Sequence, residues 1–333
     1  MARKHTFHQH PAQDVIDFGF TELPETTANA SPQAGKAVSP YDKAVMEKER
    51  KVTSPSPIKF ISFGSGSSGN CSYIGYERGG LLVDGGVKAD FVEEQLRANG
   101  ISMADVKGIL LTHDHHDHIQ YVYRILRKHK HIRLFCTNRV LNGLLLRHNV
   151  SKRIRDYHTA IYKEIPFSIL DFTITAFEVP HDGSDNMGFS LRLGDRNFVI
   201  ATDMGAVSER AYHYMKQAHF LVVEANYDLY MLRNGRYPEY LKARIETASG
   251  HMDNALTGRL LANIAGKGLK YVWLCHLSND NNRPDIAHAT VLKALEDAGF
   301  RVGTDAETRQ DLAADLILSV LPRYEATRLY VLR

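Results

Sequence analysis

The chain contains 333 residues, of which 44% are hydrophobic and 24% are charged, as is ordinary for a globular protein with one large α/β domain or two smaller ones. Its three cysteines lie far apart, so we expect neither a disulfide framework nor a thiolate zinc site, and a reducing compartment is favoured. We find no signal-peptide pattern and no apolar run of about 18 residues, so we expect a cytoplasmic protein without a membrane partner.

Residues 1–57 are expected to form a flexible N-terminal extension, because they are rich in Ser, Thr, Pro and Ala and have weak apolar periodicity. The first ordered elements are predicted to be strands at 58–63, 71–76 and 81–84 and a helix at 89–98. A glycine- and serine-rich loop at 64–70 joins the first two strands. It lacks the lysine of a P-loop, so we interpret it as a tight connection and not as a phosphate cradle.

The rest of the chain alternates between apolar strands and amphipathic helices in two β-rich halves. Further strands are predicted at 108–112, 133–136, 172–179, 189–193, 197–201, 220–223 and 271–274. Further helices are predicted at 119–128, 140–148, 254–264 and 285–298. Because each half closes with helices, the order of elements indicates a sheet-on-sheet core covered by helices.

The most informative stretch is Thr112–His118, which follows an apolar run and holds four histidines and two aspartates in six consecutive positions. Imidazoles and carboxylates are costly to bury unless they are paired or metal-bound, so packing does not explain this stretch. Read as His-x-His-x-Asp-His, it offers two imidazoles to one metal ion and a carboxylate with an imidazole to a second. The candidate ligands are His113, His115, Asp117 and His118. The alternative is a solvent-exposed loop that binds nothing.

Three more candidate ligands follow apolar strands in the same way. His181 comes after 176–180, Asp203 after 198–202, and His276 after 271–275. This recurrence suggests that one rim of the sheets collects metal ligands. Nitrogen and carboxylate ligands without sulfur suit Zn²⁺ best, with Mn²⁺ or Fe also compatible.

The segment Ile119–Arg155 contains ten Lys or Arg residues and no acidic residue. Such a basic block beside a metal loop would attract an anionic substrate, and Arg124, Arg127 and Lys128 are the candidate contacts. The alternative is a solvated basic face without a functional role.

These ligand motifs resemble the five-motif signature of the metallo-β-lactamase fold, with Asp84 matching the first motif. The resemblance is closer still to the bacterial YycJ/WalJ/VicX family and covers roughly residues 58–302. The matching segments are 65–70, 202–205, 224–228, 237–238, 241–245, 250–254 and 276–282. The family commonly has Leu-Ser where this chain has Met252-Asp253, a departure that leaves His251 in place.

The resemblance implies an α/β (α+β) fold, an αββα sandwich that forms a catalytic domain over 58–303. Residues 304–333 fall outside the resemblance, and we expect them to form a C-terminal extension packed on this domain. The resemblance also implies a site with two divalent metal ions. His113, His115 and His181 would hold one ion, and Asp117, His118 and His276 the other. Asp203 would bridge the two ions, and Asp84 would orient a ligand without binding metal itself.

His251 is then the candidate general acid for the leaving group, paired with Glu224, as in related phosphodiesterases of this fold. The alternative is that His251 only caps or packs the helix at 254–264. Within the motifs shared with the family, Asn226 and Ser278 are candidate substrate-binding residues.

The resemblance therefore implies a dinuclear metal-dependent hydrolase that cleaves phosphodiester bonds of nucleic acid, with DNA a more probable substrate than RNA. A 5′-to-3′ DNA exonuclease that uses a metal-bridging hydroxide fits best. Two alternatives stay open: a hydrolase of small esters, thioesters or lactones with the same fold, and a non-catalytic metal-dependent regulatory module. The sequence also leaves the oligomeric state open.

Overall fold

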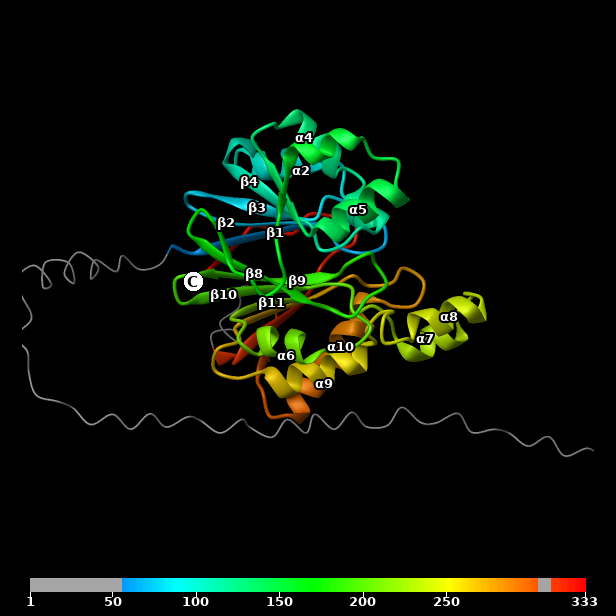
Figure 1. Cartoon of the computed structure of the whole chain (residues 1–333). Helices are drawn as coiled ribbons and strands as arrows, with labels where there is room; N and C mark the ends of the chain where they lie inside the picture. The colour runs from blue at the N-terminus through cyan, green and yellow to red at the C-terminus, as the bar shows by residue number, and fades with distance from the viewer. Residues whose placement is uncertain (1–55, 305–312) are drawn as a thin grey trace, which may run out of the picture. The chain divides into compact units, whose positions relative to one another are not determined.

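The computed structural model describes residues 56–304 and 313–333, so all but the last two residues of the expected N-terminal extension lie outside the described residues. In the described part, two mixed β-sheets pack face to face, and helices cover the outer face of each sheet (Figure 1). The αββα sandwich predicted from the sequence is confirmed.

The first sheet has seven strands in the order β15-β1-β2-β3-β4-β5-β6. Their bounds are β1 Ile58–Gly64, β2 Cys71–Tyr76, β3 Gly79–Val83, β4 Val106–Leu110, β5 Arg133–Cys136, β6 His158–Ala160 and β15 Tyr330–Leu332. Neighbours are antiparallel from β15 to β3 and parallel from β3 to β6. Strands β3 to β6 therefore all end at the same edge of this sheet.

The second sheet has eight strands in the order β13-β14-β12-β11-β10-β9-β8-β7. Their bounds are β7 Phe167–Ile169, β8 Phe172–Glu178, β9 Met187–Leu193, β10 Arg196–Ala201, β11 Phe220–Glu224, β12 Tyr271–Cys275, β13 Val302–Gly303 and β14 Leu316–Val320. Neighbours are parallel from β10 to β13 and antiparallel from β7 to β10. Strand β8 therefore points in the same direction as β10, β11 and β12.

Helices form a layer on each side of the two sheets (Figure 1). The helices on the first sheet are α2 Ala89–Ala98, α4 Val122–Lys128 and α5 Asn138–Arg147. The helices on the second sheet are α6 Glu209–Lys216, α9 Asn254–Ile264 and α10 Pro284–Asp297. Two short helices, α7 Leu229–Asn234 and α8 Glu239–Ile245, project to the side of the sandwich and share a small apolar cluster of their own (Figure 1).

The inner faces of the two sheets meet through aromatic side chains. The ring of Phe60 on β1 lies 5.1 Å from Phe198 on β10 and 4.7 Å from Trp273 on β12, measured between centroids. All three side chains are fully buried. Tilted ring pairs at this separation stabilise a core beyond the area they bury. This cluster therefore holds the two sheets against one another.

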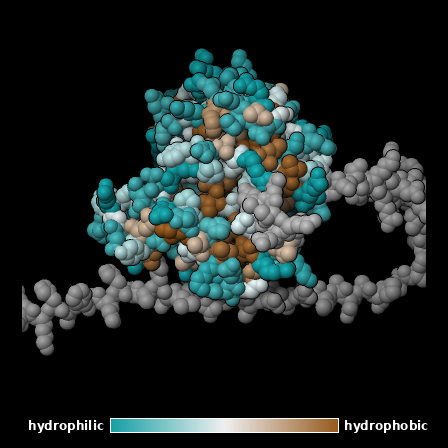
Figure 2. All heavy atoms as spheres, turned by 180° about the vertical axis from the view of Figure 1, so that it is seen from behind, coloured by the Kyte–Doolittle hydropathy of each residue, from teal (hydrophilic) through white to brown (hydrophobic). Residues whose placement is uncertain are grey.

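The surface is mostly hydrophilic over the two helix layers. On the face shown in Figure 2, the hydrophobic residues at the surface gather between those layers, at the level of the sheets. No helix within the described ranges combines the length and apolar character that crossing a membrane requires.

The predicted and observed elements differ where long-range contacts decide the backbone. The helix predicted at 89–98 forms with those bounds as α2, but the one predicted at 119–128 is interrupted between α3 (His116–Ile119) and α4. The interruption allows the Tyr121 amide to donate to the Gly85 carbonyl at 2.8 Å. Helices α6, α7 and α8 were not predicted from the sequence.

The C-terminal residues also differ from the expected extension. Strand β14 lies between β12 and β13, and β15 pairs with β1, so residues after 313 contribute one strand to each sheet. Both strands are short and pair with partners that are distant in sequence. Local periodicity therefore carries little information about them.

Replacing Phe60 by Ala is expected to lower the free energy of unfolding by about 3 to 5 kcal/mol, because the substitution leaves a cavity between the two sheets. Val331→Ala on β15 is the matched control, since that side chain is 49% exposed. Urea unfolding of the two variants tests this prediction. An equal shift of the unfolding midpoint in both variants would show that the aromatic cluster is not the main contact between the sheets.

Candidate metal centre

The side chains predicted to bind metal lie where strands of both sheets end. They follow β4, β8, β10 and β12, and Asp84 follows β3. Within each sheet these strands run in the same direction, so their carboxyl ends share one edge, which is where α/β folds commonly bind ligands. His118 Nε2, from the first sheet, lies 3.3 Å from Asp203 Oδ2, from the second, so the two edges form a single rim.

The histidines that follow β4 are held from outside the site. His118 Nδ1 donates to Asp84 Oδ2 at 2.8 Å, and His113 Nδ1 donates to Thr112 Oγ1 at 3.0 Å. Thr112 Oγ1 in turn donates to both carboxylate oxygens of Asp84, at 3.0 and 2.9 Å. One buried carboxylate therefore orients two imidazoles. This is the position expected of Asp84 as a residue that orients a ligand.

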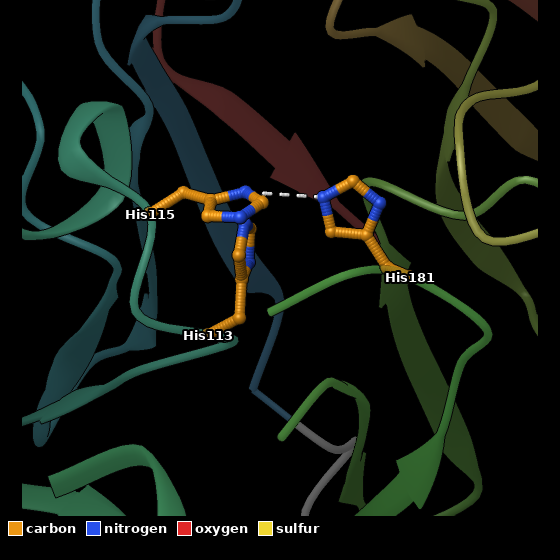
Figure 3. A group of neighbouring side chains, drawn as sticks. All are labelled: His113, His115 and His181. Carbon is orange, nitrogen blue, oxygen red and sulfur yellow. Dashed lines mark hydrogen bonds between the residues drawn. The ribbon is translucent and has the colours of Figure 1, made fainter. Parts of the chain in front are cut away.

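His181 and His115 also have partners on the side away from the centre. His181 Nδ1 donates to the carbonyl of Gly250 at 2.9 Å, and His115 Nε2 lies 3.4 Å from Asp182 Oδ1. Their other nitrogens, His181 Nε2 and His115 Nδ1, face one another at 3.2 Å. Figure 3 shows the rings of His113, His115 and His181 converging on one point, although they come from two different segments of the chain.

Glu224, the last residue of β11, joins two more histidines. Its Oε1 accepts from His251 Nδ1 at 2.7 Å and from His276 Nδ1 at 2.9 Å. Its Oε2 accepts from the backbone amides of Met204 and Met252, at 2.9 and 3.1 Å. The carboxylate is fully buried, and these four donors satisfy it. Glu224 therefore orients the two imidazoles, and it also forms a group of possible ligand atoms with Asp203, His251 and His276.

The remaining ligand atoms form groups that fit a divalent cation. In each group, every residue offers one nitrogen or oxygen atom, and these atoms lie within 4.8 Å of one another. One group is His113 with His115 and His181, and another is Asp117 with His118 and His276. A further group, His113 with His118 and Asp203, links the first two. These groups contain the residues of the two predicted ligand sets, and Asp203 belongs to the group that links them.

Two buried atoms in this cluster fit a bound divalent cation. Within the described residues, His113 Nε2 and Asp203 Oδ2 are buried without a hydrogen bond, although most buried polar atoms have one. His118 donates through Nδ1 to Asp84, and its Nε2 lies 3.3 Å from the Asp203 oxygen, so either a second proton on His118 or a metal ion is required between these two atoms. The donor set, nitrogen and carboxylate oxygen, suits Zn²⁺.

The backbone at the strand ends is strained. Asp84, Asp203 and His276 have positive φ angles of 61°, 38° and 54°, a region that residues other than glycine rarely adopt. All three come within two residues of the end of a strand. Such strain persists where surrounding contacts enforce it, and it is concentrated at functional sites.

Comparison with known proteins identifies the family. A sequence model of the beta-lactamase superfamily domain matches residues 81–276. The exodeoxyribonuclease YycJ of Bacillus anthracis is 32% identical over 246 residues, which is 74% of this chain and 92% of the relative. The exodeoxyribonuclease WalJ of Streptococcus pneumoniae is 30% identical over 262 residues, or 78% and 97% of the two chains. This chain belongs to the YycJ/WalJ family of the beta-lactamase superfamily.

The fold comparison agrees with this assignment. The crystal structure of YhfI, a metallo-β-lactamase fold protein from Bacillus subtilis, superposes with a TM-score of 0.55 over 81% of this chain and 99% of that chain, at 15% identity. As a member of the YycJ/WalJ family, the chain is a metal-dependent hydrolase, and its cluster of His and Asp residues binds divalent metal.

Two of the three residues predicted to contact phosphate from α4 are paired with acidic side chains. Arg124 pairs with Asp90 at 2.7 Å and Lys128 with Glu93 at 2.7 Å, and both acidic residues come from the neighbouring helix α2. Of these three residues, Arg127 alone has no ion pair within the described residues. Arg124 and Lys128 are therefore paired with carboxylates of a helix that precedes them, and these pairs do not favour the two residues as contacts for substrate phosphate.

Asn226 and Ser278 also have structural roles that were not predicted. The Asn226 side chain is buried and donates to the backbone carbonyl of His276 at 2.7 Å. Ser278 Oγ accepts from the amide of Asn281 at 3.2 Å and forms the turn that follows. Asn226 therefore positions the loop that carries His276.

Sequence reasoning missed the part played by the loop at 64–70. Ser65 Oγ accepts from the His276 amide at 2.9 Å, and Asn70 Nδ2 donates to Asp117 Oδ2 at 3.1 Å. The backbone at Gly86, beside this loop, approaches the backbone of Asp117 so closely that only glycine fits. A Cβ atom on Gly86 would lie 1.5 Å from the Asp117 carbonyl oxygen. The glycines and serines of this loop were a visible signal, but we interpreted them as a simple connection between strands.

Asp182 was also missed. It contacts His115, as described above, and Arg244 of α8 binds its other oxygen, with Nε to Oδ2 at 2.7 Å. The side helices α7 and α8 are thereby tied to a ligand of the candidate centre. The position of Asp182, directly after His181, is the only signal of this role in the sequence.

The histidines of the candidate centre differ in pKa according to their surroundings. Without a bound cation, burial lowers the pKa of His113, His115 and His181, so these imidazoles are neutral and ready to bind metal. Burial also opposes protonation of His118 and His276, but nearby carboxylates, Asp203 first among them, outweigh it. The pKa of His118 is therefore raised, and that of His276 is raised to about 10.

Zinc binding is therefore expected to release protons at pH 7. His118 and His276, with raised pKa values, are protonated in the metal-free protein and must lose a proton before they bind a cation, so zinc affinity should rise with pH. Calorimetric titration of chelator-treated protein, in two buffers with different ionisation enthalpies, counts these protons. A His118→Ala variant should release fewer. Heats that do not depend on the buffer would contradict the protonation states described here.

Proposed function

We propose that this protein hydrolyses phosphodiester bonds of nucleic acid, as a 5′-to-3′ DNA exonuclease with two divalent metal ions. The observation that carries the proposal is the contact of 2.7 Å between His251 and the buried Glu224, beside the cluster of metal ligands. A proton donor at this position serves a poor leaving group such as the alkoxide of a sugar. The relatives named exodeoxyribonucleases, which align over nearly their whole length, support nucleic acid as the substrate.

The residues that would hold the metal ions are those grouped above, with Asp203 between the two sets. Two divalent cations in such a centre supply Lewis acidity and lower the pKa of a bound water. The chain supplies the orientation: the imidazoles of His113, His118, His181 and His276 are hydrogen-bonded through the nitrogen that points away from the centre. Zinc suits this donor set best, with manganese or iron as alternatives.

His251 is suited to hold a proton near neutral pH. Burial lowers the pKa of His251, but the adjacent carboxylate of Glu224 raises it by more than burial lowers it, so the pKa lies above the usual value. With Nδ1 occupied by Glu224, the proton available to a leaving oxygen is on Nε2. His251 is half-buried, so that proton can reach a substrate. These features favour a general acid over a residue that only caps helix α9.

The rival functions make different demands on these residues. A thioester releases a thiolate, which needs no proton, so the His251–Glu224 pair favours a phosphodiester over a small thioester. A regulatory module without turnover would not require either residue, although it would require the ligands. The cytoplasmic location expected from the sequence is part of the same proposal, because nucleic acid is abundant there.

His251→Ala is expected to lower the turnover of an oligonucleotide by about 100-fold or more while metal content stays unchanged. The same variant should lose much less activity on bis(p-nitrophenyl) phosphate, because p-nitrophenolate leaves without protonation. Steady-state kinetics on both substrates, with elemental analysis of bound metal, test this prediction. His288→Ala on α10 is the control. Loss of metal from His251→Ala would instead identify His251 as a ligand.

The substrate and the direction of cleavage are tested with oligonucleotides labelled at one end. We expect single-nucleotide products from the 5′ end of DNA, with slower degradation of RNA, in the presence of Zn²⁺ or Mn²⁺. Raising the salt concentration from 50 to 200 mM should weaken binding by about tenfold or more if several phosphates are contacted. Hydrolysis of thioesters or lactones without any cleavage of DNA or RNA would overturn the proposed function.

A further inference from the structure

A cavity of about 340 Å³ lies next to the candidate metal centre and has no role in the function proposed so far. It is bordered by the start of α2, by the residues after α3 and by the segment between β14 and β15. The residues that matter for its chemistry are Gly86, Lys88, Phe91, Tyr121, Arg323 and Tyr324. Its volume lies within the range of about 300 to 1,000 Å³ that is usual for small-molecule sites.

The cavity shares its walls with the metal centre on two sides. On one side, Gly86 packs against the backbone of the predicted ligand Asp117, where no Cβ atom would fit. On the other side, Arg323 Nη2 donates to the carbonyl of Leu277 at 2.7 Å, and Nη1 donates to Asn279. Leu277 directly follows the predicted ligand His276. A ligand in the cavity would therefore be separated from the centre by a single layer of backbone.

The lining combines aromatic rings with cations. Tyr324 is 66% exposed, an unusual position for a large ring, and Phe91 and Tyr121 are half-buried. Lys88 is exposed and has no ion pair within the described residues. Arg323 Nε is a buried donor without a hydrogen-bond partner there, and the Arg323 guanidinium lies 5.8 Å from the centre of the Tyr324 ring.

Aromatic rings that stack on bases, together with cations that contact phosphate, are the combination that binds single-stranded nucleic acid. An apolar metabolite would not need the two cations, and an inorganic anion would not need the exposed ring. Lys88 is also better placed to contact phosphate than two of the cations on α4. Arg124 and Lys128 are already paired with carboxylates, whereas Lys88 has no such pair within the described residues.

We propose that this cavity binds one nucleotide of the substrate strand, adjacent to the phosphate that is cleaved. The base stacks on Tyr324, and Lys88 and Arg323 contact the phosphate of that nucleotide. This proposal rests on the proposed function and adds to it a position for the strand relative to the metal centre. It also makes the segment between β14 and β15, which lies outside the motifs shared with the family, part of substrate recognition.

The test compares single variants of the full-length, metal-loaded protein. Tyr324→Ala and Lys88→Ala should each raise KM for a 5′-phosphorylated single-stranded oligonucleotide about fivefold or more. The same variants should lower the ratio of kcat/KM for the oligonucleotide to kcat/KM for bis(p-nitrophenyl) phosphate. Tyr324→Phe keeps the ring and should retain most of the affinity.

The matched controls are Tyr240→Ala and Lys267→Ala. Tyr240 is 77% exposed on α8, and Lys267 is exposed between α9 and β12, so both resemble the tested residues but do not line the cavity. Equal KM values for Tyr324→Ala and Tyr240→Ala would overturn the nucleotide site and leave the proposed function intact.

Direct binding of deoxyadenosine monophosphate, measured by calorimetry, tests the site without turnover. Wild-type protein should bind it, and Tyr324→Ala should bind at least about fivefold more weakly. No binding by the wild type, or equal binding by this variant, would overturn the site. If the wild type cleaves neither DNA nor RNA, the proposed function fails, and this binding comparison alone decides whether the cavity takes a nucleotide.

Discussion

The site depends on one constraint: four of the five predicted histidine ligands, His113, His118, His181 and His276, are hydrogen-bonded through the nitrogen that faces away from the centre. A neutral imidazole carries one proton, so an outer acceptor leaves the inner nitrogen with a free lone pair. The outer partners are of different kinds. His118 uses a carboxylate, His113 a hydroxyl, and His181 a backbone carbonyl. The protein therefore fixes the orientation of these imidazole rings before any cation binds, which is the preorganisation that a metal site requires.

Holding these partners in place has a cost in backbone strain and in buried charge. The Asp84 and Glu224 carboxylates are buried, and burial raises the pKa of Asp84 even though His118 and Thr112 donate to it. Asp84, Asp203 and His276 also adopt positive φ angles. The apolar core between the sheets offsets these terms, since its strands are almost entirely buried up to the rim. Stability is thus concentrated in the strands, and strain in the residues just beyond them.

How far the sequence predicts this arrangement depends on how local the cause is. The candidate ligands were identifiable because each follows an apolar strand, and α2 was predicted with its observed bounds because its apolar periodicity and the glycine after it, Gly100, are local signals. The charge of α4 was misjudged because Asp90 and Glu93, which neutralise it, lie on another helix. Strands β14 and β15 were missed for the same reason: only their distant partners, β12 and β1, explain them.

Glu224 connects the proposed acid to the metal ligands, and this connection bears on which bond is cleaved. One oxygen, Oε1, accepts from both His251 and His276. The proton on His251 and the orientation of His276 therefore depend on the same atom, so the charge of a cation near His276 acts on His251 through a shared partner. A hydrolase of esters with good leaving groups gains nothing from this coupling. An enzyme that must protonate an alkoxide in step with attack at phosphorus gains from it directly, and for that reason the pair favours phosphodiester chemistry more strongly than the ligands do.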